Sequence, residues 1–156
     1  MTDGLTGLYN RSEIEGQIRR ALSEDGSSLS LLMLDLDDFK KVNDVHGHQE
    51  GDQVIIALAD AMRKVTGDTD ASLGRWGGEE FMILLPHSAM GDATALAEKL
   101  RETFAGISFP VSGGQTVSIG AAQAKAGEAA DALFSRVDKA LYTAKANGKN
   151  RVVVLE

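Results

Sequence analysis

The sequence contains no cysteine, so disulfide bonds, thiol catalysis and cysteine-ligated zinc or iron–sulfur sites are all excluded. It also lacks any apolar run long enough to cross a membrane, and its N-terminus lacks the basic-then-apolar profile of a signal peptide. We therefore expect a cytoplasmic domain that makes no membrane contact of its own, although a longer parent protein could carry a membrane anchor.

Prolines are equally scarce, with two in 156 residues, and no low-complexity segment, charge block or internal repeat interrupts the chain. We expect a single domain over residues 1–156, with any sensory or dimerisation segment lying upstream of this chain. The formal net charge of −7 argues against a broad nucleic-acid-binding surface. A nucleotide ligand remains compatible with this charge, because divalent metal ions can bridge phosphates and acidic side chains.

Apolar periodicity and turn residues outline the elements. The predicted helices cover 11–24, a short stretch ending near Gly47, 50–66, 89–105 and 129–146. The predicted strands cover 29–36, 73–76, 79–85, 116–122 and 151–155. The expected break after the first helix is Asp25-Gly26-Ser27-Ser28, and the expected C-cap of the last helix is Gly148. This order predicts an α/β (α+β) fold with a central mixed, mainly antiparallel sheet that contains a β-α-β-β-α-β palm-like core flanked by helices.

Three acidic residues stand where strands end or begin. Asp35 follows an apolar run, while Glu79 and Glu80 follow Gly77-Gly78, a pair that favours a hairpin turn because both positions can take positive φ. If the two strands are neighbours, Asp35 and Glu79 can converge. Paired carboxylates repel each other unless a cation lies between them, and such hard oxygen ligands favour Mg²⁺. Any one of these residues alone is more often a solvated turn residue.

Several motifs in order resemble those of the GGDEF family of diguanylate cyclases, over essentially the whole chain. The hallmark string is Gly77-Gly78-Glu79-Glu80-Phe81, preceded by Arg75-Trp76. The other matching segments are 3–11, 35–44, 47–48, 51–52, 117–120 and 142–150. A single such string is weak evidence, but a series in the right order is specific. The resemblance implies an enzyme that joins two GTP molecules into cyclic di-GMP and pyrophosphate, in an antiparallel homodimer with one GTP bound by each domain.

The resemblance also implies a metal and catalytic site. Asp35 and Glu79 match side chains that bridge two Mg²⁺ ions, for which Mn²⁺ could substitute, and the Leu36 carbonyl matches a backbone ligand. Glu79 matches the residue usually assigned as proton acceptor, a role in tension with metal bridging. Glu80 could help to hold the metals, although alternation along a strand would point it to the opposite face. Lys40 could stabilise charge on the transferring group.

Further positions match substrate contacts of the family. Backbone N–H groups at Asp38 and Phe39, at the start of a helix, favour phosphate. Lys145 and Lys149 match residues that reach the terminal phosphates, and they share one face if the helix persists to Lys149. Ordinary compensation of the helix dipole is the alternative reason for both lysines.

Guanine specificity would fall to Asn43 and Asp52. A carboxylate can accept both the N1–H and the 2-amino donors of guanine, which adenine lacks, and an asparagine amide can pair with a neighbouring ring acceptor. His48 matches a nucleotide-contacting position, but a structural role is as well supported by the sequence.

The sequence departs from the family at an inhibitory product site. Asp68 and Ala71 stand where the Arg-x-x-Asp motif has its arginine and aspartate, so we expect no product-inhibition site, and product inhibition that is absent or weak. Lys149 stands where arginine is commoner, which keeps the charge but loses the planar fork.

Two other functions fit parts of this pattern. One is a catalytically inactive module that binds GTP or cyclic di-GMP and signals by protein contact. The other is a different nucleotidyl cyclase, or a polymerase-like palm, that acts on another nucleotide. The intact acids Asp35 and Glu79 argue against the first, because a pure receptor has no need of metal ligands, and the guanine-suited pair Asn43 and Asp52 argues against the second.

Overall fold

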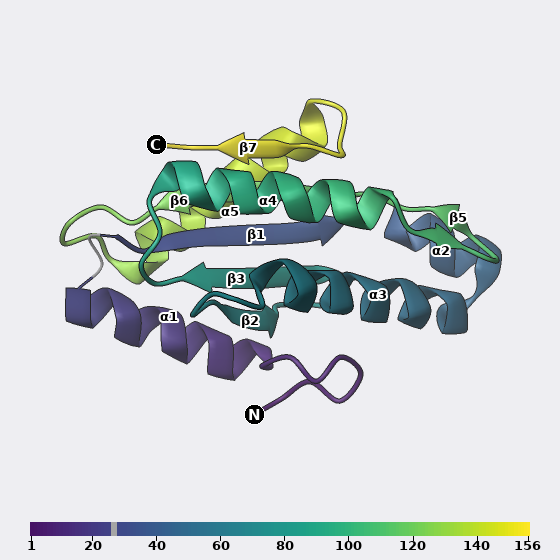
Figure 1. Ribbon diagram of the computed structural model, residues 1–156, viewed down its shortest axis with the longest axis horizontal. Coiled ribbons are helices and arrows are strands. Elements are labelled where there is room, and N and C mark those ends of the chain that lie inside the picture. The colour runs from purple at the N-terminus through teal and green to yellow at the C-terminus, as the bar shows by residue number, and fades with distance from the viewer. Residues whose placement is uncertain (26–27) are drawn as a thin grey trace.

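The computed structural model describes residues 1–25 and 28–156. Its main sheet has the strand order β2-β3-β1-β6-β7. The strands are β1 (Ser30–Leu36), β2 (Ser72–Arg75), β3 (Glu80–Leu85), β6 (Val117–Gln123) and β7 (Val152–Val154). β1 lies at the centre and pairs antiparallel with β3 and β6, β2 pairs antiparallel with β3, and β7 pairs parallel with β6. The predicted mixed, mainly antiparallel sheet flanked by helices is confirmed (Figure 1).

Five helices flank this sheet in the described part of the chain. They are α1 (Arg11–Asp25), α2 (Phe39–His46), α3 (His48–Thr66), α4 (Met90–Ala105) and α5 (Ala130–Ala146). The apolar side chains of α2, α3 and α4 pack with Leu32, Leu34 and Leu36 of β1 on one face, and those of α1 and α5 pack with Leu31 and Met33 on the other. Successive strand residues point to opposite faces, so Asp35 leaves β1 on the face of α5.

The predicted elements are confirmed with boundaries shifted by one or two residues. In the predicted break after α1, Gly26 and Ser27 lie outside the described residues. The expected cause of the β2–β3 hairpin was wrong: neither Gly77 nor Gly78 has a positive φ. The connection is a longer turn, in which the N–H groups of Trp76 and Gly77 both donate to the Glu80 carbonyl.

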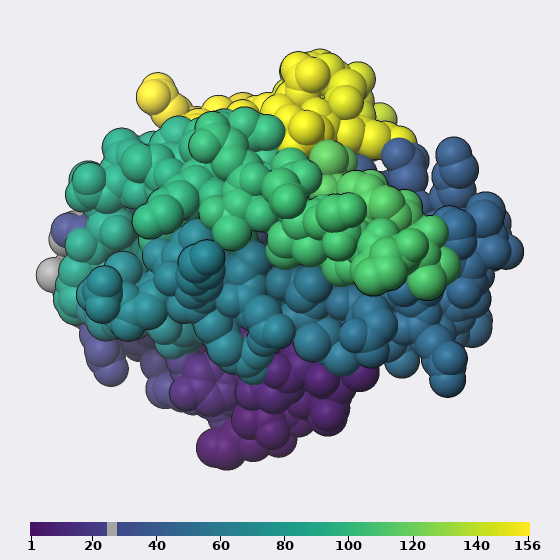
Figure 2. Space-filling view, turned by 45° about the vertical axis from the view of Figure 1, so that its right-hand side comes forward, coloured from purple at the N-terminus to yellow at the C-terminus, as the bar shows by residue number. Residues whose placement is uncertain are grey.

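A small two-stranded sheet was not predicted. It pairs β4 (Ser108–Phe109) with β5 (Gly113–Gly114), and two-residue strands carry too little periodicity to be recognised in a sequence. Ser112 in this hairpin donates to Glu50 of α3 through both its N–H and its hydroxyl. The green hairpin therefore lies against the blue α2–α3 segment, as Figure 2 shows.

Helix α5 is held unusually close to the sheet at Gly120 of β6. A Cβ atom there would lie 2.4 Å from the backbone nitrogen of Leu141 and 2.6 Å from the carbonyl oxygen of Val137. Only glycine permits such an approach of helix backbone to strand. This packing fixes the direction of α5, whose C-terminal end points to the end of β1.

None of the helices in the described residues combines the length and the apolar character that a membrane span requires.

Candidate active site

The end of β1 meets the start of β3, and this junction brings the predicted acids together. Asp35 is paired with Glu80 in the register, and the Leu36 N–H donates to the Glu79 carbonyl oxygen at 3.2 Å. Residues directly opposite each other in a sheet share a face, so Glu80 leaves the sheet on the side of Asp35. The expectation that alternation would point Glu80 to the opposite face is therefore wrong. We call Asp35, Glu79 and Glu80 together the acidic edge.

The acidic edge is electrostatically unfavourable without a cation. Burial raises the pKa of Asp35 from 3.8 to about 6, and the charges of Glu79 and Glu80 add to the rise against the opposing effect of Lys145. Burial also raises the pKa of Glu79. Carboxylates whose ionised forms are disfavoured by burial and by each other are suited to a bound cation.

The donor set fits a hard divalent ion. Asp35 and Glu79 supply carboxylate oxygens and Leu36 supplies a carbonyl oxygen, which are the ligand types that Mg²⁺ prefers. Over residues 1–25 and 28–156, no group of three or more His, Asp or Glu side chains is close enough to bind a metal by itself. The chain thus offers an incomplete shell of two side chains and one carbonyl, as expected for Mg²⁺ that is also bound through substrate phosphates and water.

Lys145 reaches this edge from the last turn of α5. Its ammonium lies 2.9 Å from the Leu36 carbonyl oxygen, 2.9 Å from Asp37 Oδ1 and 3.5 Å from Asp35 Oδ1. The sequence predicted that this lysine reaches terminal phosphates. In the structure its charge contacts two of the three predicted metal ligands.

Lys149 approaches by a different route from the one considered in the sequence. Helix α5 ends at Ala146, so it does not persist to Lys149 and the two lysines do not share a helical face. The C-cap of α5 is Asn147, one residue before the predicted Gly148, which follows it with φ of 119°, and the Lys149 N–H donates to the Ala144 carbonyl at 3.0 Å. The Lys149 ammonium lies 2.6 Å from Asp38 Oδ1, at the exposed start of α2.

The start of α2 is a place where phosphate could bind. Asp38 precedes the helix in the left-handed region, with φ of 56°. Within the described chain, the N–H groups of Asp38, Phe39 and Lys40 have no hydrogen-bond acceptor. Free N–H groups at a helix N-terminus attract anions, and Lys145 and Lys149 stand beside them.

A pocket of about 440 Å³ opens between α2, α3 and the β2–β3 turn, and we call it the α2–α3 pocket. It is lined by Phe39, Lys40, Asn43, His48, Asp52, Ile55, Arg75, Gly78 and Glu79. The structure thus gathers six of the residues predicted from the sequence into one concavity. Asp35, Leu36, Lys145 and Lys149 do not line it and lie at the neighbouring end of β1.

The Asn43 amide is placed by a glycine of α3. A Cβ atom at Gly51 would lie 1.9 Å from Asn43 Oδ1. This oxygen is buried and has no hydrogen-bond partner among the described residues. A buried amide oxygen without a partner is costly and is therefore uncommon unless a ligand or water completes it.

Arg75, for which no role was predicted, holds the β2–β3 turn. Its Nε and Nη2 atoms donate to the Gly78 carbonyl at 3.2 and 2.7 Å, and Nη1 donates to Asp3 Oδ1 at 3.1 Å. Asp3 also accepts from the Thr6 N–H and hydroxyl. The N-terminal segment and the turn that carries Glu79 are therefore tied together. The sequence feature that could have indicated this role is an arginine two residues before the Gly-Gly pair.

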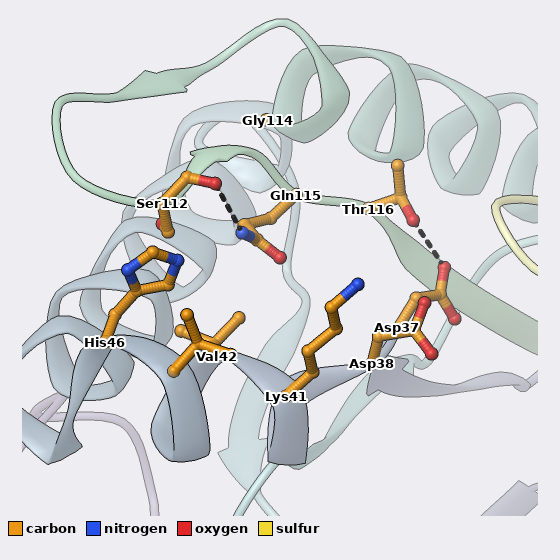
Figure 3. Close-up of a pocket in the computed structure, with 10 residues that line it drawn as sticks. Asp37, Asp38, Lys41, Val42, His46, Ser112, Gly114, Gln115 and Thr116 are labelled. Carbon is orange, nitrogen blue, oxygen red and sulfur yellow. Dashed lines mark hydrogen bonds between the residues drawn. The ribbon is translucent and has the colours of Figure 1, made fainter.

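Asp37 was the second residue without a predicted role, although it lies within the matched segment 35–44. It is buried at 4 % exposure and borders a further pocket of about 280 Å³ between α2 and the 112–116 segment (Figure 3). Figure 3 shows its hydrogen bond with Thr116, which joins the end of β1 to the start of β6. The sequence feature that could have indicated this role is an aspartate directly after an apolar strand.

Comparisons with known proteins agree with this geometry. The family described as "Diguanylate cyclase, GGDEF domain" matches residues 1–151. Among curated relatives, the diguanylate cyclase DgcM of Escherichia coli K12 is 43% identical over 157 residues, which cover 97% of this chain and 37% of the relative. The chain therefore spans little more than a third of that protein.

Solved structures match over almost the whole chain. The GGDEF domain of DgcB from Caulobacter crescentus, in complex with c-di-GMP, superposes with a TM-score of 0.93 at 36% identity, covering 98% of this chain and 94% of that one. The active GGEEF domain of a diguanylate cyclase from Vibrio cholerae gives a TM-score of 0.89 at 34% identity, covering 94% of this chain and 97% of that one.

Proposed function

Because the chain belongs to the family of diguanylate cyclase GGDEF domains, we propose that it condenses two GTP molecules into cyclic di-GMP and two pyrophosphates. The observation that supports this most directly is the acidic edge, where Asp35 and Glu79 have raised pKa values, next to a pocket lined by Asn43 and Asp52. A carboxylate pair beside a guanine-suited pocket is the arrangement that nucleotidyl transfer with a divalent ion needs.

In this proposal Asp35, Glu79 and the Leu36 carbonyl would hold Mg²⁺, or Mn²⁺ in its place. The bound ions would neutralise phosphate charge and lower the pKa of a ribose 3′-hydroxyl. Glu79 or Glu80 accepts the proton of that hydroxyl while the 3′-oxygen attacks the α-phosphorus of the other GTP. The bond between the α-phosphorus and the bridging oxygen of pyrophosphate breaks, and pyrophosphate leaves with its electron pair.

The remaining predicted residues bind the substrate. Asp52 accepts from the guanine N1–H and 2-amino groups, Asn43 pairs with a neighbouring ring acceptor, and His48 lies at the rim of the same pocket. The N–H groups at Asp38 and Phe39 bind phosphate oxygens. Lys40, whose side chain is 91% exposed at the pocket rim, stabilises charge on the transferring group.

Lys145 and Lys149 bind the terminal phosphates in this proposal. Both lysines stand beside the start of α2 in the structure, so a triphosphate that leaves the α2–α3 pocket would meet them last. In this proposal Lys149 exchanges its contact with Asp38 for phosphate, and Lys145 exchanges its contacts with Leu36 and Asp35 for phosphate while it keeps its hydrogen bond to Asp37.

Two copies of the domain are required, because the product is two-fold symmetric and each site binds one GTP. A closed two-fold arrangement presents each 3′-hydroxyl to the α-phosphate held by the other copy. We propose an antiparallel homodimer that forms around the two substrates, as the acidic edge of one copy has to face that of the other.

The test is incubation of the chain with GTP and Mg²⁺ at high concentration, alone and fused to a dimerising coiled coil, with separation of the nucleotide products. Cyclic di-GMP is expected, and Glu79→Gln should abolish it while leaving the melting temperature within a few degrees. If the dimerised wild-type chain binds GTP but yields no cyclic di-GMP, the domain is instead a nucleotide-binding module that signals by contact.

A further inference from the structure

Asp37 binds four hydrogen-bond donors through its two carboxylate oxygens. Oδ1 accepts from the Ser118 hydroxyl at 2.7 Å and from the Lys145 ammonium at 2.9 Å. Oδ2 accepts from the Thr116 hydroxyl at 2.7 Å and from the Asn150 backbone N–H at 2.9 Å. The donors come from the start of β6, the end of α5 and the loop that follows α5.

These bonds place both lysines of the substrate site. Lys145 has a long side chain that would sample many rotamers if its ammonium were not fixed. Lys149 lies in the loop 147–150, where it and Asn150 have φ values of 65° and 46°. Two successive non-glycine residues in the left-handed region are unfavourable, so an external contact stabilises this loop. The bond from the Asn150 N–H to Asp37 supplies one.

Only an ionised carboxylate can serve here. An asparagine has one acceptor oxygen, and its amide hydrogens would face donors in place of the second oxygen. A carboxylate offers two lone pairs on each of its two oxygens, and the four donors around Asp37 match these four acceptor sites.

We propose that Asp37 is a positioning residue for the terminal phosphate: it presets Lys145 and the Lys149 loop, and so makes the site select a nucleoside triphosphate over a diphosphate. This inference rests on the proposed function, in which those lysines bind the terminal phosphates. Asp37 acts through the lysines and touches no substrate itself.

The structure separates this role from nucleoside recognition. Asn43, His48 and Asp52 line the α2–α3 pocket, whereas Asp37 is absent from that lining and borders the pocket on the hairpin side of α2. GTP and GDP share the nucleoside and differ only at the chain end that meets the lysines. Loss of Asp37 should therefore weaken triphosphate binding more than diphosphate binding.

The experiment compares the wild-type chain with Asp37→Asn and with Glu128→Gln as a matched control. The side chain of Glu128 is 8% exposed and accepts from Arg136 of α5 at 2.7 Å, but it lies just before the other end of that helix. Calorimetry in Mg²⁺ gives the dissociation constants of GDP and of the unreactive α,β-methylene analogue of GTP. Thermal denaturation of each variant is recorded beside them.

Asp37→Asn should reduce the preference for the triphosphate by about tenfold, the effect of losing about one charge-assisted phosphate contact. Glu128→Gln should lower the melting temperature and leave the preference within about twofold of wild type. In a Lys145→Met background the effect of Asp37→Asn should shrink, because one of the two lysines it positions is gone.

If Asp37→Asn does not fold, Thr116→Val tests the proposal in its place. It removes one of the four hydrogen bonds to Asp37 and should give a smaller loss of the preference for triphosphate over diphosphate. A folded variant that keeps the wild-type preference overturns the role of Asp37 alone. Absence of any guanine-nucleotide binding by the wild-type chain overturns the proposed function instead.

Discussion

The Lys145 ammonium lies 2.9 Å from the carbonyl oxygen of Leu36. The same nitrogen is 3.5 Å from Asp35 Oδ1, so one side-chain cation contacts a carbonyl and a carboxylate that form part of the proposed metal site. Two cations cannot share these oxygens without strong repulsion. A divalent ion would therefore compete with Lys145 for the oxygens of Leu36 and Asp35, while the hydrogen bond from Lys145 to Asp37 remains.

The first prediction concerns divalent-ion binding without nucleotide. Lys145→Met should bind Mn²⁺ about tenfold more tightly than the wild-type chain, because a positive charge no longer opposes the ion. The free Mn²⁺ signal in electron paramagnetic resonance measures this directly, with no turnover required. The same variant should lose cyclase activity, because the lysine is also proposed to bind phosphate.

Lys149→Met is the matched control for that measurement. It removes the same charge from a residue that contacts Asp38 and neither Leu36 nor Asp35. An equal gain in Mn²⁺ affinity in both variants would show that net charge alone is responsible and that the position of Lys145 is irrelevant.

The second prediction concerns the pH dependence of stability. Because the pKa of Asp35 is raised from 3.8 to about 6 in the folded chain, the folded state holds this proton more tightly than the unfolded state. The free energy of unfolding then falls as pH rises from about 4 to 6, by at most roughly 3 kcal/mol for a shift of this size. Asp35→Asn should therefore stabilise the metal-free chain at pH 7.5 and have little effect at pH 4.

Urea denaturation in the presence of a chelator, at both pH values, checks this. Asp37→Asn should behave in the opposite way at pH 7.5, because its carboxylate has a lowered pKa and ionised Asp37 stabilises the fold. A loss of stability for Asp35→Asn at pH 7.5 would contradict the assignment of Asp35 as an unfavourably buried charge.

The fold was predictable because each element has its own local signal. Leu29 to Leu34 is almost continuously apolar, and the helices have apolar residues at helical spacing. The order of the helices and strands could therefore be predicted from periodicity. The β4–β5 hairpin was missed because Ser108–Phe109 and Gly113–Gly114 are too short to show a period. The contact of the loop after α5 with Asp37 was also missed, because the Asn150 hydrogen bond to Asp37 joins residues 113 positions apart.

Some residues of the candidate site could likewise be predicted from the sequence, and others could not. The residues that line the α2–α3 pocket lie in matched motifs, so the sequence identified them, although their roles stay predictions. Arg75 and Asp37 were missed because what they do is visible only in their partners: Asp3 and Gly78 for the first, Ser118 and Lys145 for the second. Periodicity and motif order carry no information about such long-range contacts.

The third prediction tests how Asn43 is placed. Gly51→Ala would put a methyl group 1.9 Å from Asn43 Oδ1, so the amide has to move. GTP affinity should fall by about tenfold and the preference for GTP over ATP should shrink. Alanine favours a helix over glycine, so the fold should be retained.

Gly91→Ala in α4 is the control, since its Cβ would meet no atom within 4 Å. Unchanged nucleotide affinity in Gly51→Ala would refute a role for the Asn43 position.

The fourth prediction concerns inhibition by the product. Asp68 and Ala71 lie between α3 and β2, in place of the arginine and aspartate of the family's inhibitory motif, and Asp70 between them faces His87 at 3.8 Å. Without a guanidinium to bind phosphate and guanine, added cyclic di-GMP should inhibit the active dimer only weakly, by competing at the active site. The double variant Asp68→Arg with Ala71→Asp should become more sensitive by about tenfold or more. Initial rates at fixed GTP and increasing cyclic di-GMP measure this, and strong non-competitive inhibition of the wild-type chain would show that another surface binds the product.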